Sequence, residues 1–102
     1  MPHQPIPKTS DTDPLRIDEV STGGGGGALG LTFCPGKVQP DAMHGPWARD
    51  LAKDIQAIRD WGASALVNLL EVHEMRELQV PQLAEAIGTS MTYFHLPIRD
   101  AD

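Results

Sequence analysis

The chain has 102 residues, which bounds it to one domain at most. Its 14 acidic and 8 basic residues give a formal charge of −6, and no Lys/Arg cluster occurs along the sequence, so neither a nucleic-acid partner nor an anionic membrane surface is expected. The single cysteine, Cys34, excludes an internal disulfide and fits a reducing compartment, and no apolar run is long enough to span a bilayer. A cytoplasmic protein is therefore expected.

The first two expected strands follow a polar leader. Residues 1–14 hold four prolines and no apolar period, which predicts a disordered leader and no signal peptide. The segment 15–20 partly alternates and predicts an edge strand, and 28–33 predicts a second strand that pairs with it as a hairpin. The glycine run 23–27 is interpreted as a flexible turn, because a phosphate-binding glycine loop would precede a helix N-terminus.

The clearest periodic pattern predicts a helix from Pro46 to Trp61. Proline suits the first helical position, where its missing N–H costs nothing. One apolar stripe, expected to pack against a sheet, follows at spacings of four and three: Trp47, Leu51, Ile55, Ile58 and Trp61. The charged residues are expected mostly to face water: Arg49, Asp50, Lys53, Asp54, Arg59 and Asp60. Gly62 is the expected stop.

The rest of the chain predicts strands that alternate with short helices. A largely apolar segment, 63–70, predicts a buried parallel strand, and 71–78 predicts a short helical turn. A second helix is predicted over 81–87, ended by Gly88, and 91–98 is predicted as the last strand. This order requires two right-handed crossovers. We therefore expect an α/β fold with a mostly parallel sheet and flanking helices.

The candidate catalytic residues stand where the last strand ends. Asp100 and Asp102 follow Pro97, and a carboxylate just beyond a strand end can act as a general acid, although loop aspartates are also commonly just solvated. Cys34 is interpreted as a structural thiol, because no glycine-rich anion nest follows it. The four histidines lack metal-site spacing, so neither a metal nor another cofactor is expected, and His95 is expected to be a hydrogen-bonded residue at the edge of the core.

Three blocks of sequence, taken in order, resemble a known family. They are Leu29 to Lys37; Asp50 to Ala63, followed by Val67 to Glu71 and His73-Glu74-Met75; and Leu78 to Leu83, followed by His95 to Asp100. In this order and spacing, the segment 15–102 resembles the N-terminal half of bacterial proteins of the cyclin-dependent kinase inhibitor 3-like, or kinase-associated phosphatase-like, group. These are dual-specificity and tyrosine phosphatases.

The resemblance implies a role for the chain and for one residue. It implies that 15–102 is the N-terminal part of a phosphatase-like α/β domain, whose full-length parent hydrolyses phosphate monoesters through a cysteinyl-phosphate intermediate. The implied substrate is a phosphoprotein or another phosphate ester. By the same resemblance, Asp100 is the general acid that protonates the leaving oxygen, with Asp102 as the second choice if the loop register is shifted.

The chain departs from this family in one respect that affects activity. The family's nucleophile motif, His-Cys followed by five residues and Arg, occurs nowhere in the 102 residues, and neither Cys34 nor Arg99 matches it. The resemblance therefore implies a truncated, partial cysteine-phosphatase fold whose C-terminal half is missing, inactive alone. An alternative is a non-catalytic interaction module that binds a partner chain or a phosphoprotein, with self-association through an open sheet edge. A third alternative is a small active enzyme that uses Cys34.

Overall fold

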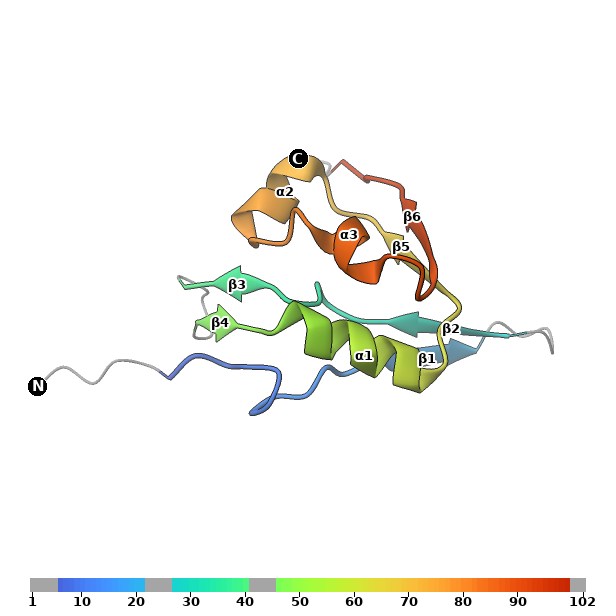
Figure 1. The fold of residues 1–102 in the computed structure, drawn as a ribbon, viewed down its shortest axis with the longest axis horizontal. Helices are drawn as coiled ribbons and strands as arrows, with labels where there is room; N and C mark the ends of the chain where they lie inside the picture. The colour runs from blue at the N-terminus through green and yellow to red at the C-terminus, as the bar shows by residue number, and fades with distance from the viewer. Residues whose placement is uncertain (1–5, 22–26, 41–45, 100–102) are drawn as a thin grey trace, which may run out of the picture.

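The computed structural model describes residues 6–21, 27–40 and 46–99, which form an α/β arrangement of short elements (Figure 1). In chain order they are β1 (Asp18–Ser21), β2 (Ala28–Leu31), β3 (Val38–Gln39), β4 (Trp47–Ala48), α1 (Leu51–Trp61), β5 (Ala65–Asn68), α2 (Val72–Glu77), α3 (Leu83–Ile87) and β6 (Thr92–His95). Figure 1 shows α2, α3, β5 and β6 gathered on one side of α1. No helix among these residues is long and apolar enough to cross a membrane.

The central helix α1 is shorter than its sequence pattern predicts. It begins at Leu51, because the Asp50 carboxylate accepts a hydrogen bond of 3.1 Å from the Lys53 N–H and caps the helix. It ends at Gly62, whose left-handed backbone (φ 105°) closes the last turn. The predicted start at Pro46 is therefore wrong. Trp47 lies in β4, where the extended backbone pairs with Gln39 of β3.

The strands form three separate two-stranded sheets among the described residues, and this corrects the expected mostly parallel sheet. Only β5 and β6 are parallel; β1–β2 and β3–β4 are antiparallel. The predicted β1–β2 hairpin is confirmed, with Val20 opposite Leu29. A parallel pair needs a crossover, and the segment from α2 to α3 supplies it between β5 and β6. The sequence pattern predicted β1, β2, β5 and β6, but it missed β3 and placed the residues of β4 in the helix from Pro46. Beyond the β1–β2 hairpin, it could not determine which strands share a sheet.

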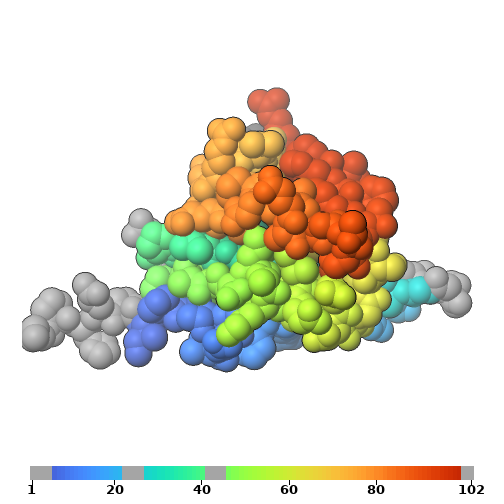
Figure 2. Space-filling model, viewed as in Figure 1, coloured from blue at the N-terminus to red at the C-terminus, as the bar shows by residue number. Residues whose placement is uncertain are grey.

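One hydrophobic core lies between α1 and the α2–α3 segment. Its buried members are Ile55, Ile58, Met75, Val80, Leu83, Ile87 and Met91. Figure 2 shows the surface of α2, α3 and β6 resting directly on that of α1. On the opposite side, Trp61 packs on Gly30 so closely that a Cβ there would lie 3.0 Å from the indole ring. Glycine at this position therefore lets α1 approach β2.

The parallel pair β5–β6 buries one face and exposes the other. Its side chains alternate, so that Asn68 and Tyr93 face the core side while the register partners Val67 and Phe94 remain 51% and 48% exposed. Leu96 and Ile98 beyond β6 are also more than half exposed. Parallel strands normally have both faces covered. We call the exposed side chains of Val67, Phe94, Leu96 and Ile98 the bare face.

The N-terminal segment packs along the body of the molecule in its described part. The Lys8 N–H donates to the Pro46 carbonyl, and the Lys8 carbonyl accepts from the Ala48 N–H, both at 2.9 Å. Lys53 Nζ donates to both carboxylate oxygens of Asp11 at 2.8 Å. Partners distant in sequence thus supply hydrogen bonds to residues 6–14 that the composition of this segment does not indicate. The disordered leader over 1–14 stays a prediction.

The core predicts a strong response to truncation in α1. Replacing Ile58, which is 6% exposed, with alanine should lower the free energy of unfolding by about 2–5 kcal/mol, because a cavity is left between α1 and α3. Gln56→Ala on the exposed side of the same helix should change it by less than about 0.5 kcal/mol. Urea unfolding followed by far-UV circular dichroism measures both. Equal effects of the two substitutions would show that Ile58 is not a core residue.

Candidate functional site

The end of β6 is the place where the sequence predicts the catalytic acid. Beyond His95 the chain continues alongside the end of β5, since the Leu96 N–H donates to the Asn68 carbonyl at 2.8 Å and the Ile98 N–H donates to the Leu69 carbonyl at 2.9 Å. Both candidate acids, Asp100 and Asp102, lie outside the described residues. The described part of the chain therefore leads to the acid positions without including them.

A small polar network supports this strand end. Asn68, which is buried, donates from Nδ2 to Tyr93 Oη and accepts from the Leu70 N–H through Oδ1, both at 2.9 Å. The His95 ring contacts the Leu70 carbonyl through Nε2, which agrees with its expected role as a hydrogen-bonded residue at the core edge. Sequence reasoning missed the link between Asn68 and Tyr93, because parallel pairing brings them together across 25 residues. These groups bind one another and act as supports for the strand end.

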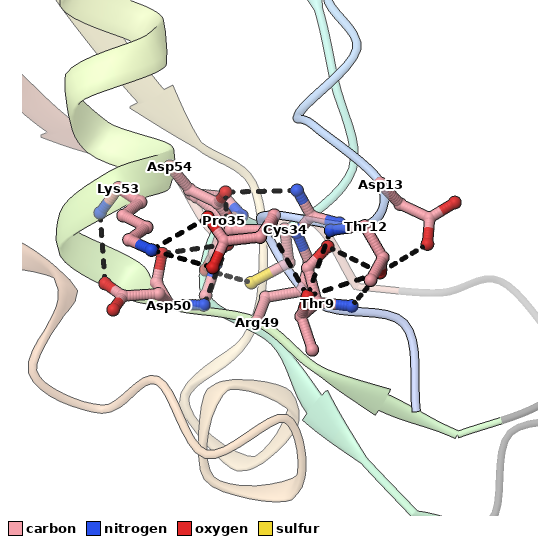
Figure 3. A network of polar contacts seen from close by, with 12 residues as sticks. Thr9, Thr12, Asp13, Cys34, Pro35, Arg49, Asp50, Lys53 and Asp54 are labelled. Carbon is pink, nitrogen blue, oxygen red and sulfur yellow. Dashed lines mark hydrogen bonds and ion pairs between the residues drawn. The ribbon is translucent and has the colours of Figure 1, made fainter. Parts of the chain in front are cut away.

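The most buried charged groups form an ion pair at the start of α1 (Figure 3). Arg49 donates from Nε to Asp54 Oδ2 at 2.8 Å and from Nη2 to Oδ1 at 3.1 Å, and the two side chains are 0% and 1% exposed. The expectation that both residues face water is wrong. Water is replaced by a bidentate charge-assisted contact, which is the geometry that makes burial of such a pair tolerable.

Asp54 also joins two segments that are distant in sequence. Its Oδ2 accepts the Gly36 N–H, and its Oδ1 accepts the Ser10 hydroxyl, each at 2.8 Å. Gly36 has a left-handed backbone (φ 70°), and a Cβ at this position would lie 2.6 Å from the Leu51 Cβ. Glycine is therefore required for the 35–36 turn to present its N–H to the carboxylate. No local pattern signals this network, because its partners come from three separate segments.

Cys34 lies beside this network but is not activated. Its Sγ contacts the Pro35 carbonyl at 3.5 Å, and burial raises the pKa of the thiol to about 11 against an opposing effect of the Lys37 charge. The Asp54 carboxylate raises the pKa further. At neutral pH the group is a thiol, and a nucleophile needs the thiolate. The geometry thus supports the structural interpretation of Cys34 over its use in catalysis.

One group of metal-ligand side chains occurs among the described residues, at the start of α2. Ligand atoms of Glu71, His73 and Glu74 lie within 4.8 Å of one another. These groups already have structural partners: Glu74 Oε1 accepts the Glu71 N–H at 2.9 Å, and His73 Nδ1 lies 3.2 Å from Glu71 Oε2. The Glu71 side chain in turn accepts from the Glu74 backbone N–H, and these reciprocal contacts form a capping box at the helix N-terminus. We therefore interpret this cluster as part of the N-terminal cap of α2 and not as a metal site.

Comparisons with known proteins bear on the fold. No protein-family model and no curated protein matches the chain. Its structure is similar to that of kinase-associated phosphatase with the catalytic-site cysteine replaced by serine, with a TM-score of 0.73 and 23% sequence identity. The match covers 85% of this chain and 48% of that one, so the chain spans about half the length of the phosphatase it matches. The chain thus has a phosphatase-like α/β fold.

The buried ion pair predicts a large loss of stability when one partner is changed. Asp54→Asn leaves the Arg49 charge buried without its counter-ion and should lower the free energy of unfolding by about 3–5 kcal/mol. Asp60→Asn, on the exposed side of α1, is the matched control and should change it by less than about 0.5 kcal/mol. Chemical unfolding monitored by tryptophan fluorescence distinguishes them. A loss below about 1 kcal/mol for Asp54→Asn would contradict a buried, essential pair.

The raised pKa of Cys34 predicts slow alkylation. With a pKa of about 11 in place of the ordinary 9.0, the thiolate fraction at pH 8 falls roughly 100-fold, and the rate with iodoacetamide should fall with it. The rate should rise steadily as the pH approaches 11, because the thiolate is then formed. Mass spectrometry of native protein, against protein unfolded in guanidinium, measures this difference. Equal native and unfolded rates at pH 8 would show an exposed, unperturbed thiol.

Proposed function

We propose that this chain is the N-terminal part of a protein tyrosine or dual-specificity phosphatase domain and that Asp100 is its general acid. The observation that carries the proposal is the similarity of fold to kinase-associated phosphatase, at a TM-score of 0.73 over 85% of the chain. The order of the sequence blocks points to the same group independently. A phosphoprotein or another phosphate ester is the proposed substrate of the complete domain, and the cytoplasm is its proposed location.

The anchoring of the segment beyond β6 supports a role for the acid loop. The hydrogen bond from the Ile98 N–H to the Leu69 carbonyl holds the backbone two residues before Asp100. Because β5 and β6 are parallel, their carboxyl ends meet at one edge, and sites in open α/β sheets are built at such an edge. A carboxylic acid starting from an anchored backbone can reach a leaving-group oxygen with little loss of conformational freedom.

The chain alone lacks the groups that a phosphoryl transfer requires. Catalysis needs a nucleophile and preorganised donors for the phosphate oxygens. Cys34 is held as a thiol by burial, and its sequence context does not match the nucleophile motif. Arg49 is engaged by Asp54. In this proposal, the nucleophile loop and its arginine are supplied by a second half of the domain.

The first expected outcome is the absence of turnover by the 102-residue chain. Purified protein should not hydrolyse para-nitrophenyl phosphate above the buffer rate, since the nucleophile motif is absent. Turnover that copurifies with the chain and disappears in Cys34→Ser would overturn the proposal and establish the small active enzyme.

The role of Asp100 is tested in a longer protein in which a segment with the His-Cys-x5-Arg motif follows residue 102. The DNA that follows codon 102 shows whether such a segment is encoded. Asp100→Asn should slow hydrolysis of a phosphotyrosine peptide by about 10²–10⁴, because the tyrosyl oxygen must be protonated as it leaves. The loss should be much smaller on a fluorinated aryl phosphate, whose leaving group needs no proton. Asp102→Asn is the matched control. A large loss for Asp102→Asn with no such loss for Asp100→Asn would identify Asp102 as the general acid.

A non-catalytic interaction module is the second candidate, and the bare face favours it. Val67, Phe94, Leu96 and Ile98 expose apolar side chains from neighbouring positions of one sheet face and the segment beyond it. Contiguous apolar surface of this kind marks an interaction surface in soluble proteins. In this alternative, the face binds a second copy of the chain.

Self-association through the bare face can be measured directly. Sedimentation velocity at micromolar concentration should show a concentration-dependent dimer, which Phe94→Ser and Ile98→Ser together weaken by about tenfold or more through loss of buried apolar area. Ile6→Ser is the matched control, because Ile6 is 80% exposed and lies in the N-terminal segment. A strictly monomeric wild-type chain would contradict the module as a self-associating unit.

A further inference from the structure

Two aromatic rings from separate segments form a partly exposed surface beside the β3–β4 ladder. Phe33 follows β2 and Trp47 begins β4; their ring centroids lie 5.2 Å apart at an angle of 56°. Phe33 is 37% exposed and Trp47 is half-buried, so one side of the pair faces solvent. Trp47 therefore lies in this partly exposed aromatic pair and not in the core stripe of a helix, where its spacing predicted it.

Three cations from distant parts of the sequence surround these rings. Lys37 Nζ lies 4.6 Å from the Phe33 centroid and 4.3 Å from the Trp47 centroid. Lys8 Nζ lies 4.8 Å from the Trp47 centroid. The buried Arg49 also lies near both rings, with its Cζ 5.0 Å from the Phe33 centroid and 5.6 Å from the Trp47 centroid. We call Lys8, Lys37, Phe33 and Trp47 the cationic–aromatic surface.

Positive charge is in excess at this surface. Asp54 neutralises Arg49, but no carboxylate in the described part of the chain forms an ion pair with Lys8 or Lys37. Arg49 Nη1 is buried without a hydrogen-bond partner. Burial lowers the pKa of Lys37, and the charges of Arg49 and Lys8 lower it further against an opposing effect of Cys34. Lys8 and Lys37 thus both lie near the Trp47 ring without an ion-pair partner among the described residues, in a chain whose formal charge is −6.

We propose that the cationic–aromatic surface binds a phosphate-type oxyanion, held by the ammonium groups of Lys8 and Lys37. An ammonium offers three donors as a compact point charge, which suits a tetrahedral anion with several oxygens. The aromatic rings exclude water from one side and so strengthen the attraction. The unpaired charge is confined to these few side chains, so the ligand is a single phosphate group, free or carried as an ester, and not a nucleic-acid backbone.

This site does not depend on the proposed phosphatase function. The site uses no nucleophile and none of the residues after β6, and all four of its residues belong to the 102-residue chain. A phosphate ester bound there would not be cleaved by the nearby thiol of Cys34, because this thiol is protonated at neutral pH with its pKa at about 11.

The test titrates inorganic phosphate into the 102-residue chain at constant ionic strength, with chloride as the balancing anion. The two indole N–H signals in a ¹⁵N correlation spectrum report separately on Trp47 and on Trp61, which packs against Gly30 away from the site. We expect the chemical shift of the Trp47 indole signal to change and saturate with phosphate concentration, while that of Trp61 stays constant. Movement of both signals in proportion, or none that saturates, would overturn the proposal.

Two double variants that remove the same net charge distinguish a specific binding site from a general electrostatic effect. Lys8→Gln with Lys37→Gln should weaken phosphate binding by about tenfold or more, since both charge-assisted contacts are lost. Arg59→Gln with Arg76→Gln removes the same net charge from exposed positions on α1 and α2 and should leave binding unchanged. Equal weakening in the two double variants, or no weakening in the lysine variant, contradicts the site.

Two further arms complete the experiment. Phosphate should raise the pKa of the Lys37 amine in the unaltered chain, and NMR measures this pKa. An unchanged pKa contradicts the site even if the lysine variant fails to fold.

Phenyl phosphate distinguishes the two sources of the anion. Tighter binding than inorganic phosphate identifies an ester that also contacts the rings, and equal binding identifies the free ion.

Discussion

The rest of the structure depends on how the buried charge of Asp54 is satisfied. A carboxylate that is 1% exposed must replace its lost hydration with donors, and it draws them from Arg49, Gly36 and Ser10. These contacts fix the start of α1 against the 35–36 turn and the N-terminal segment. Through Arg49 the same network reaches the aromatic pair of Phe33 and Trp47. One charge therefore organises one end of the molecule.

The other end is organised by apolar packing that covers only one side. α1 and α3 bury one face of the β5–β6 pair, while Val67 and Phe94 remain half exposed on the other. The matched phosphatase is about twice as long as this chain, as the 48% coverage of its length shows. A second half of a phosphatase domain, as proposed, would cover this face. The proposed dimer would cover it with another copy of the same surface.

The candidate sites differ in how far the sequence could indicate them. Asp100 and Asp102 are predicted from a local signal, the position just beyond a strand end and Pro97, together with the family resemblance, and they stay predictions. The cationic–aromatic surface could not be predicted from the sequence, because Lys8, Lys37 and Arg49 lie in separate segments and no run of basic residues marks them. Arg49 and Asp54 were expected to face water, since charge on a helix ordinarily does. Their burial is possible only because Gly36 and Ser10 supply donors from outside the helix.

Local interactions in the sequence determined the elements: the hairpin β1–β2, the stop of α1 at Gly62, the short helices and the final strand. These depend on alternation, capping and glycine conformation within a few residues. Tertiary structure alone decided how the strands beyond this hairpin pair, where α1 begins and which charges are buried. Trp47 shows the reason: its spacing fits the helix stripe, but pairing with β3 and hydrogen bonds to the Lys8 backbone make the adjoining chain extended. Such long-range hydrogen bonds leave no periodic trace in the sequence.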